Sequence, residues 1–560
     1  MPRNVAEQEE SVGLLDDNSL TLEAVVTASS ATSHETYSSS ISSSSSVCSD
    51  DFDIYFDEPK FVAYKRPRWR DSFAGWCRSR PRHVRRKFRR PRWATIGRLL
   101  RYLFLIICTL IVATPIFASS YTKPPAQYRD LELRCHGPTP PAGCANPHNE
   151  KVFLAISLYD NGGHLAGGMW GTNLLQLIHI IGEKNVFLSI YENNSGPEGE
   201  AALLSFKRRL RCRHKIVIDS DVPLSDFEDH IIILPDGSKR LKRLAYLSEM
   251  RNRALRPIDT FNPEDGIVEY DRILFMNDVA FRPTDAANLL FSTNVGPDGK
   301  AQYLSTCGLD YMAPLLFYDL YAMRDAEGYS NGLPIFPIFS NAGQGVSRAA
   351  MLAGSDAVPV SSCWGGIVAM DAKYVQNRKA ELPSPHFQDI GSHVIEPSSP
   401  TNVTTPVRFR YEPEIFFDAC ECCLFLADVS QAARKSNATE LGVFVNPYVR
   451  VAYDFDTLAW LPWVKHWERL FSIPQRVLSP MLRLPTHNPH RTVQEGDTFT
   501  EEIWVGEGDG GHWKSVERVA RNGMFCGVRE MQALQIEERT EDKNWENFHI
   551  PDGQVLYFPT

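Results

Sequence analysis

Short groups of polar residues follow four apolar runs of the sequence, and they are the residues best placed to do chemistry. The groups are Tyr159–Gly163, Tyr191–Asn194, Asp219–Asp221 and Asn277–Val279. In open α/β sheets, ligands bind beyond the carboxyl ends of the strands, so polar groups at strand ends are the first candidates for a binding site. A second interpretation, in which Asp160 and Asp219 only cap turns, stays open.

Asp278 is the strongest single candidate, because it closely follows the apolar run 272–276 and would be held rigidly at the edge of a sheet. A divalent cation that bridges diphosphate oxygens needs one or two protein carboxylates and usually keeps several waters. Asp278, with Asn277 beside it, therefore predicts a metal and diphosphate site. The competing interpretation is an N-terminal cap for a helix expected from Pro283.

Other classes of protein lose their support. No Gly-x-x-x-x-Gly-Lys-Ser/Thr occurs, and the glycines between 162 and 168 lack a dinucleotide fingerprint, which argues against kinases and dehydrogenases. Cys420-Glu-Cys-Cys423 holds one Cys-x-x-Cys without a second ligand pair, so disulfides or buried thiols are favoured over zinc. The net charge of −9 argues against a polyanionic partner.

The elements that must position these residues alternate along the chain. Apolar runs predict strands at 152–158, 185–191, 215–218 and 272–276, and helical patterns predict helices at 172–181, 200–211 and 241–255. This alternation is typical of a doubly wound α/β sheet. One or two cations of a basic stretch can reach a diphosphate, and most are expected on a solvated helix face. The stretch consists of Lys239, Arg240, Lys242, Arg243, Arg251, Arg253 and Arg272.

An uncharged apolar run at 102–121 predicts one membrane-spanning helix, because about 20 residues cross the hydrocarbon layer of a bilayer. A buried core helix is the alternative. Many Lys and Arg residues precede the run and few follow it, which predicts a cytosolic N-terminus and a luminal remainder. The basic segment is interpreted as a juxtamembrane anchor, and a nucleic-acid site is the rival interpretation.

These observations divide the chain into segments. We expect a disordered Ser-rich, acidic tail at 1–59, a basic segment at 60–101, the membrane helix at 102–121, a luminal stem at 122–150, a large folded domain at 151–465 and an extension of unassigned role at 466–560. Cys135 and Cys144 can pair within the stem. Sequons at Asn193, Asn402 and Asn437 agree with a luminal setting.

Five motifs, in order, resemble one known family. They are Phe187–Glu192, Arg272–Val279, Ser361–Gly366, Glu421–Leu424 and Val445–Tyr453. Over about residues 150–465 the chain resembles the fungal capsule-associated, cryptococcal mannosyltransferases of glycosyltransferase family 69. The tail, the basic segment and the single apolar helix also resemble the type II membrane arrangement of Golgi glycosyltransferases.

The resemblance implies a GT-A-like, Rossmann-type α/β domain in the lumen of the Golgi or another secretory compartment. The implied reaction is transfer of mannose from GDP-mannose to a mannoside or other glycan acceptor, making an α-1,3 linkage with retention of configuration. The implied cofactor is a divalent cation, Mn²⁺. The implied role is synthesis of fungal cell-surface glycan or capsule polysaccharide, without nucleic acid as a partner.

The resemblance also assigns donor-site residues. Tyr191, Glu192, Asn277, Asp278 and Trp364 are expected to bind the donor, with Asp278 as the metal ligand. Asn277-Asp278 is not a full Asp-x-Asp, whereas Asp219-Ser-Asp221 has that spelling after a different strand. Trp364 offers an aromatic face to a sugar or, in the alternative, belongs to the core.

Carboxylates are expected on the acceptor side. Glu421 is ranked above Glu414, Asp418 and Asp428 because the family motif contains it, and it is expected to stabilise an oxocarbenium-like transition state or to bind the acceptor. Asp310 and Asp371 are expected to contact acceptor hydroxyls or to be ordinary caps. Two rival functions stay open: the same fold with another nucleotide sugar, and a catalytically inactive, membrane-anchored subunit for glycan assembly.

Overall fold

The computed structural model describes residues 93–219, 222, 226–227, 230–233, 238–259, 268–377, 406–412, 416–436, 441–485, 488, 490–505, 512–528, 530–534 and 545–548. The chain divides into two units, Met1–Ser44 and Ser45–Thr560, and the fold described below is that of the second. The predicted tail at 1–59, the basic segment before 93, and Asp221, Asn402, Glu414 and Asn437 lie outside the described residues.

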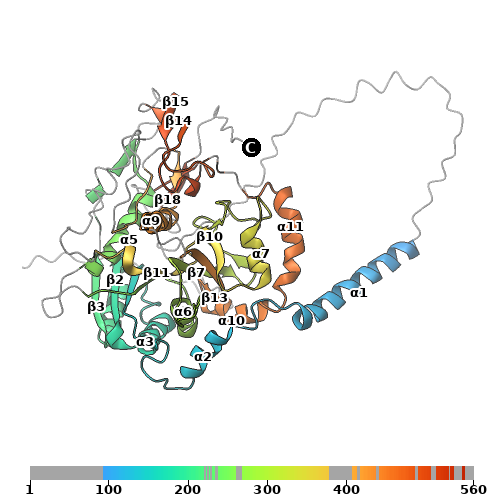
Figure 1. Ribbon diagram of the computed structural model, residues 1–560, viewed down its shortest axis with the longest axis horizontal. Coiled ribbons are helices and arrows are strands. Elements are labelled where there is room, and N and C mark those ends of the chain that lie inside the picture. The colour runs from blue at the N-terminus through green and yellow to red at the C-terminus, as the bar shows by residue number, and fades with distance from the viewer. Residues whose placement is uncertain are drawn as a thin grey trace, which may run out of the picture. The chain divides into compact units, whose positions relative to one another are not determined.

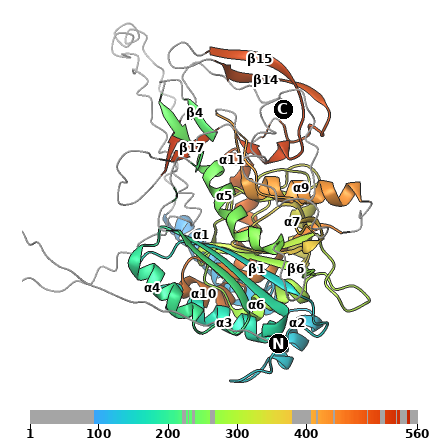
Figure 2. The ribbon, with the colours of Figure 1, turned by 90° about the vertical axis from the view of Figure 1, so that its left-hand side faces the viewer.

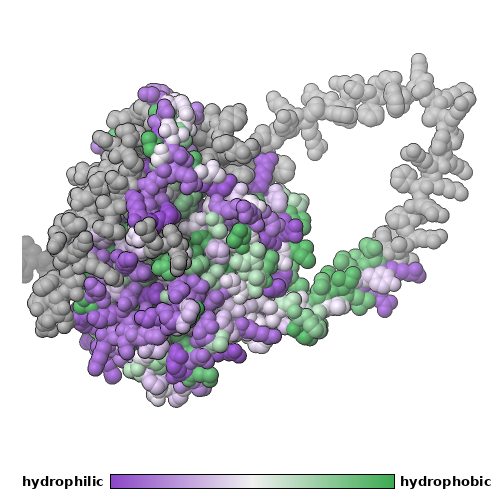
Figure 3. All heavy atoms as spheres, viewed as in Figure 1, coloured by the Kyte–Doolittle hydropathy of each residue, from purple (hydrophilic) through white to green (hydrophobic). Residues whose placement is uncertain are grey.

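A long apolar helix precedes the folded domain. Helix α1 spans Trp93–Phe117, and its window Gly97–Phe117 has a mean hydropathy of 2.2 with only 6% of it buried. Figure 3 shows the helix as a largely hydrophobic surface. By length and composition this helix can cross a membrane. It ends before the predicted limit of 121, because Ser120 and Tyr121 are buried against the domain.

A ten-stranded mixed sheet forms the centre of the domain (Figure 1), with the order β3-β2-β1-β6-β11-β7-β13-β10-β9 and with β8 paired to β7. Strands β3, β2, β1 and β6 are parallel, β11 is antiparallel to both β6 and β7, and β13 is parallel to β7. The strands are β1 Val152–Leu158, β2 Val186–Asn193, β3 Arg213–Asp219, β6 Arg272–Met276, β7 Ser305–Ala313, β8 Leu316–Phe317, β9 Arg324–Asp325, β10 Val358–Ser362, β11 Ile367–Asp371 and β13 Val443–Ala452. The predicted α/β class is confirmed, although the sheet is not wholly parallel.

Helices cover both faces of this sheet, as Figure 2 shows. Helices α5 (Arg243–Leu255) and α9 (Glu421–Lys435) share one buried core with β1 and β6 residues such as Phe153 and Phe275. Helices α3 (Met169–Ile181) and α6 (Pro283–Phe291) share the other core with Leu154 and Met276. Since successive side chains of a strand point to opposite faces, each of these strands contributes to both cores.

The remaining elements surround this centre. The helices are α2 Ala126–Arg134, α4 Gly196–Lys207, α7 Val346–Ala353, α10 Phe455–Val464 and α11 Ser472–Met481, with short 3-10 turns η1 Glu183–Asn185, η3 Arg256–Asp259, η4 Ala372–Tyr374, η5 Glu468–Phe471 and η7 Met524–Cys526. The small strand pairs are β4 Ile231–Ile233 with β5 Lys239–Leu241, β12 Asp418–Ala419 with β16 Gly527–Val528, β14 Thr498–Val505 with β15 His512–Val519, and β17 Met531–Leu534 with β18 Trp545–Phe548.

The predicted elements of the N-terminal half are all present. Strands at 152–158 and 272–276 have the predicted bounds, while β2 and β3 extend beyond the apolar residues that predicted them. Strand β3 lies at the edge of the sheet, so its charged residues at 213–215 can pair through the backbone without entering the core. Helix α4 starts four residues before the predicted 200, because Pro197 stands at its first turn, where proline fits.

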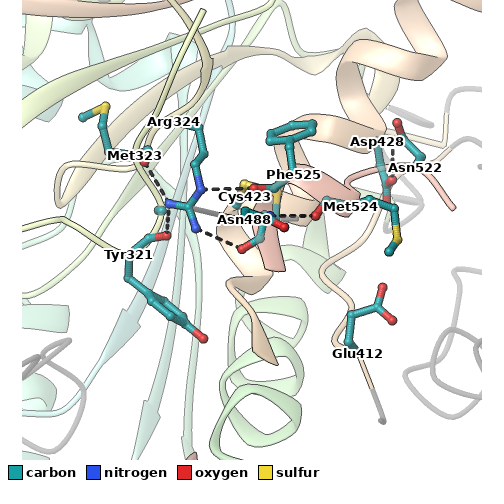
Figure 4. Close-up of a disulfide and its surroundings, with 12 residues drawn as sticks. Tyr321, Met323, Arg324, Glu412, Cys423, Asp428, Asn488, Asn522, Met524 and Phe525 are labelled. Atoms are coloured by element: carbon teal, nitrogen blue, oxygen red, sulfur yellow. Dashed lines mark hydrogen bonds between the residues drawn. A yellow bond between two sulfur atoms is a disulfide. The ribbon is translucent and has the colours of Figure 1, made fainter. Parts of the chain in front are cut away.

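Disulfides hold distant parts of the chain together. The predicted stem pair Cys135–Cys144 is present, Cys307–Cys363 joins β7 to the loop after β10, and Cys423–Cys526 joins α9 to the C-terminal part. Figure 4 shows the last of these, with Arg324 beside it. Arg324 donates to the carbonyl oxygens of Phe525 at 3.2 Å and Cys526 at 3.0 Å. Residues after 465 are therefore bonded into the domain.

Candidate active site

The strand register brings the predicted site residues to one edge of the sheet. Tyr191 on β2 pairs with Ser157 on β1, and β6, on the other side of β1, ends at the same level, just before Asn277. Tyr191 and Asn277 are thus separated by two strand spacings, about 10 Å. Strand β11 is antiparallel to both β6 and β7, so β7 runs in the same direction as β6. Asp310, near the end of β7, therefore reaches this edge as well. The predicted residues at these strand ends therefore share one edge of the mixed sheet.

Arg251 on α5 joins three of the predicted residues in one buried cluster. Its Nε donates to Glu421 Oε1 at 2.9 Å, and its Nη1 donates to Asn277 Oδ1 at 3.2 Å. The indole Nε1 of Trp364 donates to the same Asn277 oxygen at 3.2 Å, and the guanidinium lies 5.0 Å from the Trp364 ring centroid. None of the four side chains is more than 4% exposed. Three of the five sequence motifs therefore meet at one cation.

Glu421 and Trp364 are enclosed in this cluster. Glu421 is the first residue of α9, where a helix favours negative charge, and its carboxylate is paired with Arg251. The Trp364 ring lies 5.3 Å from that of Phe275 and 5.6 Å from that of Phe409, measured between centroids. Trp364 thus has the placement of a core residue in this structure, and its contact with a sugar stays a prediction.

Asn277 has an amide group available to a ligand. Its Oδ1 accepts from Arg251 and Trp364, which fixes the orientation of the amide. Its buried Nδ2 has no hydrogen-bond partner among the residues that the structure describes. Since buried polar groups in proteins nearly always have a partner, this N–H is suited to donate to a phosphate or sugar oxygen.

Asp278 supplies one carboxylate next to that amide and is 5% exposed. A hard cation bound to a nucleoside diphosphate takes one or two carboxylates besides phosphate oxygens and water, so Asp278 meets the minimum for Mn²⁺. Within the described residues, the one group of three potential ligands at metal-binding separations is Cys420, Glu421 and Cys422. Cys420 and Cys422 are free and buried, which agrees with the predicted buried thiols, and burial raises the pKa of both.

Tyr191 belongs to a second polar cluster, centred on Arg253. The Tyr191 hydroxyl donates to Asp219 Oδ2 at 2.6 Å and accepts from Arg253 Nη1 at 2.9 Å. Arg253 also pairs with Asp219 at 3.3 Å and with Glu249 at 2.8 Å. Burial, together with the hydrogen bond to Asp219, raises the pKa of Tyr191 well above its usual range, so the phenol stays a donor.

A cavity of about 570 Å³ opens beside this cluster, over the β2 and β3 face. This volume lies in the range of small-molecule sites. Its wall combines aromatic rings with cations, the combination that an aromatic base carrying phosphates requires. The residues that give it this character are Phe187, Tyr191, Tyr270, Arg213, Lys215, Arg253 and Arg256.

Glu192 lies on the opposite face of β2 from Tyr191 and supports the following loop. Its Oε1 accepts from the Ser195 backbone N–H at 2.7 Å, and burial raises the pKa of its carboxyl group. Its buried Oε2 has no hydrogen-bond partner in the described part of the chain. Asn193 is 6% exposed and is bonded to Tyr246 and to the Asp219 carbonyl, so its sequon is buried.

Asp310 is held in a network next to the Trp364 loop. Its Oδ1 accepts from the Asp319 N–H at 3.1 Å, and its Oδ2 accepts from the Tyr453 hydroxyl at 3.2 Å. Asp319 in turn accepts from the Gly365 N–H at 3.0 Å. Gly365 has a φ of +58°, and a Cβ there would overlap the backbone of β7, so the motif requires glycine at this position.

Other candidate acids have structural partners. Both oxygens of Asp160 accept backbone N–H groups of the glycine-rich turn, from Leu165 and Ala166. Asp371 caps a 3-10 turn and lies at the opposite edge of the sheet, paired with the first residue of β6. Asp418 is paired with Lys242 at 2.7 Å, and Asp428 with Arg410 at 2.7 Å.

The expectation that most of the basic stretch lies on a solvated helix face is wrong. Lys242, Arg243, Arg251 and Arg272 are all less than 10% exposed. Each finds a polar partner inside the protein, such as Gln532 for Arg243 and Glu150 for Arg272. The acids and amides that compensate these cations are far away in sequence, so the helical pattern alone suggested a solvated face.

Two functional candidates were missed or undervalued by the sequence analysis. Arg251 was one of seven cations in a stretch, and no local signal distinguishes it, because Glu421 is distant in sequence. Asp319 follows no predicted strand end, yet it connects Asp310 with Gly365. Tyr453, by contrast, lies in the last of the five motifs, which was the available signal.

Comparisons with known proteins agree with the motifs. The family model described as cryptococcal mannosyltransferase 1 matches residues 151–428. No curated protein matches the chain. Among solved structures, a mannosyltransferase from Pyrobaculum calidifontis in complex with GDP-Man and Mn2+ aligns with 10% identity and a TM-score of 0.29, covering 70% of this chain and 78% of that one, a likeness too low to carry an argument. The family whose model matches residues 151–428 is thus the one that the five motifs resemble.

Proposed function

We propose that this protein transfers mannose from GDP-mannose to a mannoside acceptor, forming an α-1,3 linkage with retention of configuration. The family match supports mannosyl transfer, and the linkage and stereochemistry follow from the resemblance of the motifs. The observation that carries the proposal is the buried cluster in which Arg251 binds Asn277 and Glu421 at the ligand edge of the sheet.

The donor site of this proposal lies across β2, β1 and β6 in a GT-A-like arrangement. The cavity beside Tyr191 takes the nucleotide, since its wall has aromatic rings for a base and guanidinium groups for phosphates. The free amide N–H of Asn277 meets an oxygen of the diphosphate or the sugar. Glu192, on the other face of β2, holds the loop after that strand in place and so supports the donor site.

The acceptor side contains Glu421 and Asp310. Glu421 carries negative charge close to the donor edge, where it favours a sugar that develops positive character in the transition state. Because Arg251 and the first turn of α9 hold this carboxylate, its position is fixed before the substrates bind. Asp310, held by Tyr453, faces the same edge and is proposed to bind an acceptor hydroxyl.

Mn²⁺ is the proposed cofactor, with Asp278 as its protein ligand. When bound, such an ion neutralises charge on the diphosphate that leaves. Arg251 is paired with Glu421, and Arg253 with Asp219 and Glu249, so these two cations already balance acids of the protein and offset less of the charge on a diphosphate. This imbalance is the reason to expect dependence on a divalent cation.

The proposed setting is the lumen of the Golgi, with α1 as a type II membrane anchor. Three disulfides lie after α1, and such bonds persist in the oxidising secretory pathway. The predicted cationic flank before the helix favours the same orientation. Protease protection of sealed microsomes tests this topology: the domain after 121 must survive until detergent opens the vesicles.

The decisive assay uses the full chain in detergent with a panel of nucleotide sugars and α-mannoside acceptors, each with Mn²⁺ or with a chelator. We expect transfer from GDP-mannose and a product whose new bond is an α-1,3 linkage by NMR. Asp278→Asn should abolish transfer, whereas Asp371→Asn, the same change at the opposite edge, should retain it. A folded protein inactive with every donor and metal would refute the proposal, and turnover with another donor would correct the sugar.

A further inference from the structure

Helix α11 buries polar side chains and exposes apolar ones, the reverse of a surface helix on a soluble protein. Its buried residues are Gln475 and Ser479, which are at most 2% exposed. Gln475 bonds inward to the carbonyl oxygens of Ile338 and Phe339, and Ser479 accepts from the Leu333 N–H. The exposed stripe, 41–71% accessible, consists of Ile473, Val477, Leu478 and Met481 on the helix and Leu482 just after it.

A second apolar surface precedes this helix in the chain. Trp460 and Trp463 on α10 are 60% and 62% exposed. Arg476 and Arg483 are exposed beside the apolar stripe of α11. Tryptophans and arginines around an apolar face are typical of the membrane interface, where ring and guanidinium meet lipid headgroups.

The segment between α10 and α11 is bonded to the end of α1. The Ser120 N–H donates to the Lys465 carbonyl at 2.9 Å, and the Trp467 indole donates to the Ile111 carbonyl at 3.1 Å. Pro115 lies inside α1 four residues after Ile111 and has no N–H, so the Ile111 carbonyl lacks its usual helical donor. Trp467 replaces that donor and fixes the anchor helix against the domain.

We infer that the exposed faces of α10 and α11 are a membrane-docking surface. Through this surface, the domain lies on the same bilayer that α1 crosses. This inference rests on the proposed role of α1 as the anchor. Ile111 lies six residues before the end of α1, about 9 Å along a helix. Interfacial helices sink about 5–10 Å into the lipid boundary, so the contact with Trp467 places α10 and α11 at the matching depth. Figure 3 shows hydrophobic residues on the side of the domain where α11 and the end of α1 lie.

The test uses the full chain in vesicles that contain phospholipids brominated near the headgroup end of the acyl chain, because bromine quenches nearby tryptophan. In a variant carrying Trp460→Phe and Trp463→Phe, a large share of the quenching should be lost. The matched control Trp170→Phe removes a buried indole and should leave it unchanged. Equal quenching in all three proteins would overturn the inference.

A charge placed in the stripe gives an independent measure. Val477→Glu should weaken quenching of Trp460 and Trp463, whereas Leu204→Glu on α4, an exposed apolar residue outside the docking surface, should not. If a second copy covers this face instead of lipid, the wild-type chain in nanodiscs will show two copies per disc and no contribution of these tryptophans to quenching. Failure of the anchor itself is distinguishable, because the chain would then be released from vesicles by alkaline carbonate.

Discussion

Removal of Arg251 should destabilise the domain strongly, because it leaves the Glu421 carboxylate buried without its cation. The two side chains are 4% and 2% exposed, so solvent screens them little. Breaking a buried pair on one side typically costs about 3–5 kcal/mol. For a domain of about 400 residues, the entropy of unfolding near the midpoint is about 0.8 kcal/mol per degree, so Arg251→Met should lower Tm by about 5 °C.

The double variant Arg251→Met with Glu421→Gln separates the pair from other losses. Because both charges are gone, its melting temperature should be higher than the sum of the two single effects predicts. The difference should correspond to a coupling free energy between the two residues of about 0.5–3 kcal/mol. Arg434→Met, at the exposed end of α9, is the matched control and should change stability by less than about 0.5 kcal/mol. The assay is differential scanning fluorimetry of the full chain in detergent.

Activity adds a second readout to this cycle. Glu421→Gln keeps the shape of the side chain and removes its charge. If the Glu421 carboxylate is catalytic, turnover should fall by a larger factor than the affinity for the donor. An Arg251→Met protein that melts within about 1 °C of the wild type, or single effects that simply add, would refute the electrostatic reasoning.

Four further changes test separate parts of the structure. Asp278→Asn should lower turnover at least about 100-fold, since a metal at the diphosphate contributes several kcal/mol to the barrier, and should abolish the response to Mn²⁺ in the transfer assay. Gly365→Ala should reduce the yield of folded protein, because its φ of +58° disfavours a side chain and the added Cβ overlaps β7. Burial, followed by the charge of Asp418, raises the pKa of Glu530 to about 7, so the folded chain binds this proton more tightly than the unfolded chain does. Stability should therefore fall from about pH 4.5 to 7, and Glu530→Gln should flatten that part of a Tm profile. Cys423→Ser should cost about 2–5 kcal/mol, because the bond to Cys526 spans 103 residues, and limited proteolysis should then release C-terminal fragments.

The N-terminal half of the fold was predictable because its strands are continuous apolar runs. Val152–Leu158 and Arg272–Met276 lie inside the sheet with helices on both faces, which requires the uninterrupted hydrophobic pattern that identifies them. The carboxyl-end rule then placed Tyr191 and Asn277 correctly at one edge. Strand β3 was harder, since an edge strand tolerates charged residues and its pattern is weaker.

The partners of the site residues were not predictable, since they depend on contacts between distant segments. Arg251 and Glu421 are separated by 170 positions, and each alone resembles a surface residue of a helix. The order of β11, β7 and β13 in the sheet is likewise a matter of topology, which short motifs do not encode. Only the family resemblance assigned Trp364 to the donor site and ranked Glu421 first among the acceptor-side acids.

Helix α5 connects the two halves of the domain through charge. Arg251 of this helix meets the Asn277 amide after β6 and the Glu421 carboxylate of α9, and the residue before the helix, Lys242, pairs with Asp418. Hydrophobic side chains would fill the same space without desolvation cost, so stability alone does not explain buried ion pairs. Such pairs demand one register, because a shift by one residue leaves charges buried and unmatched. Arg251 therefore fixes Glu421 relative to Asn277, as the proposed transfer between a donor and an acceptor would require.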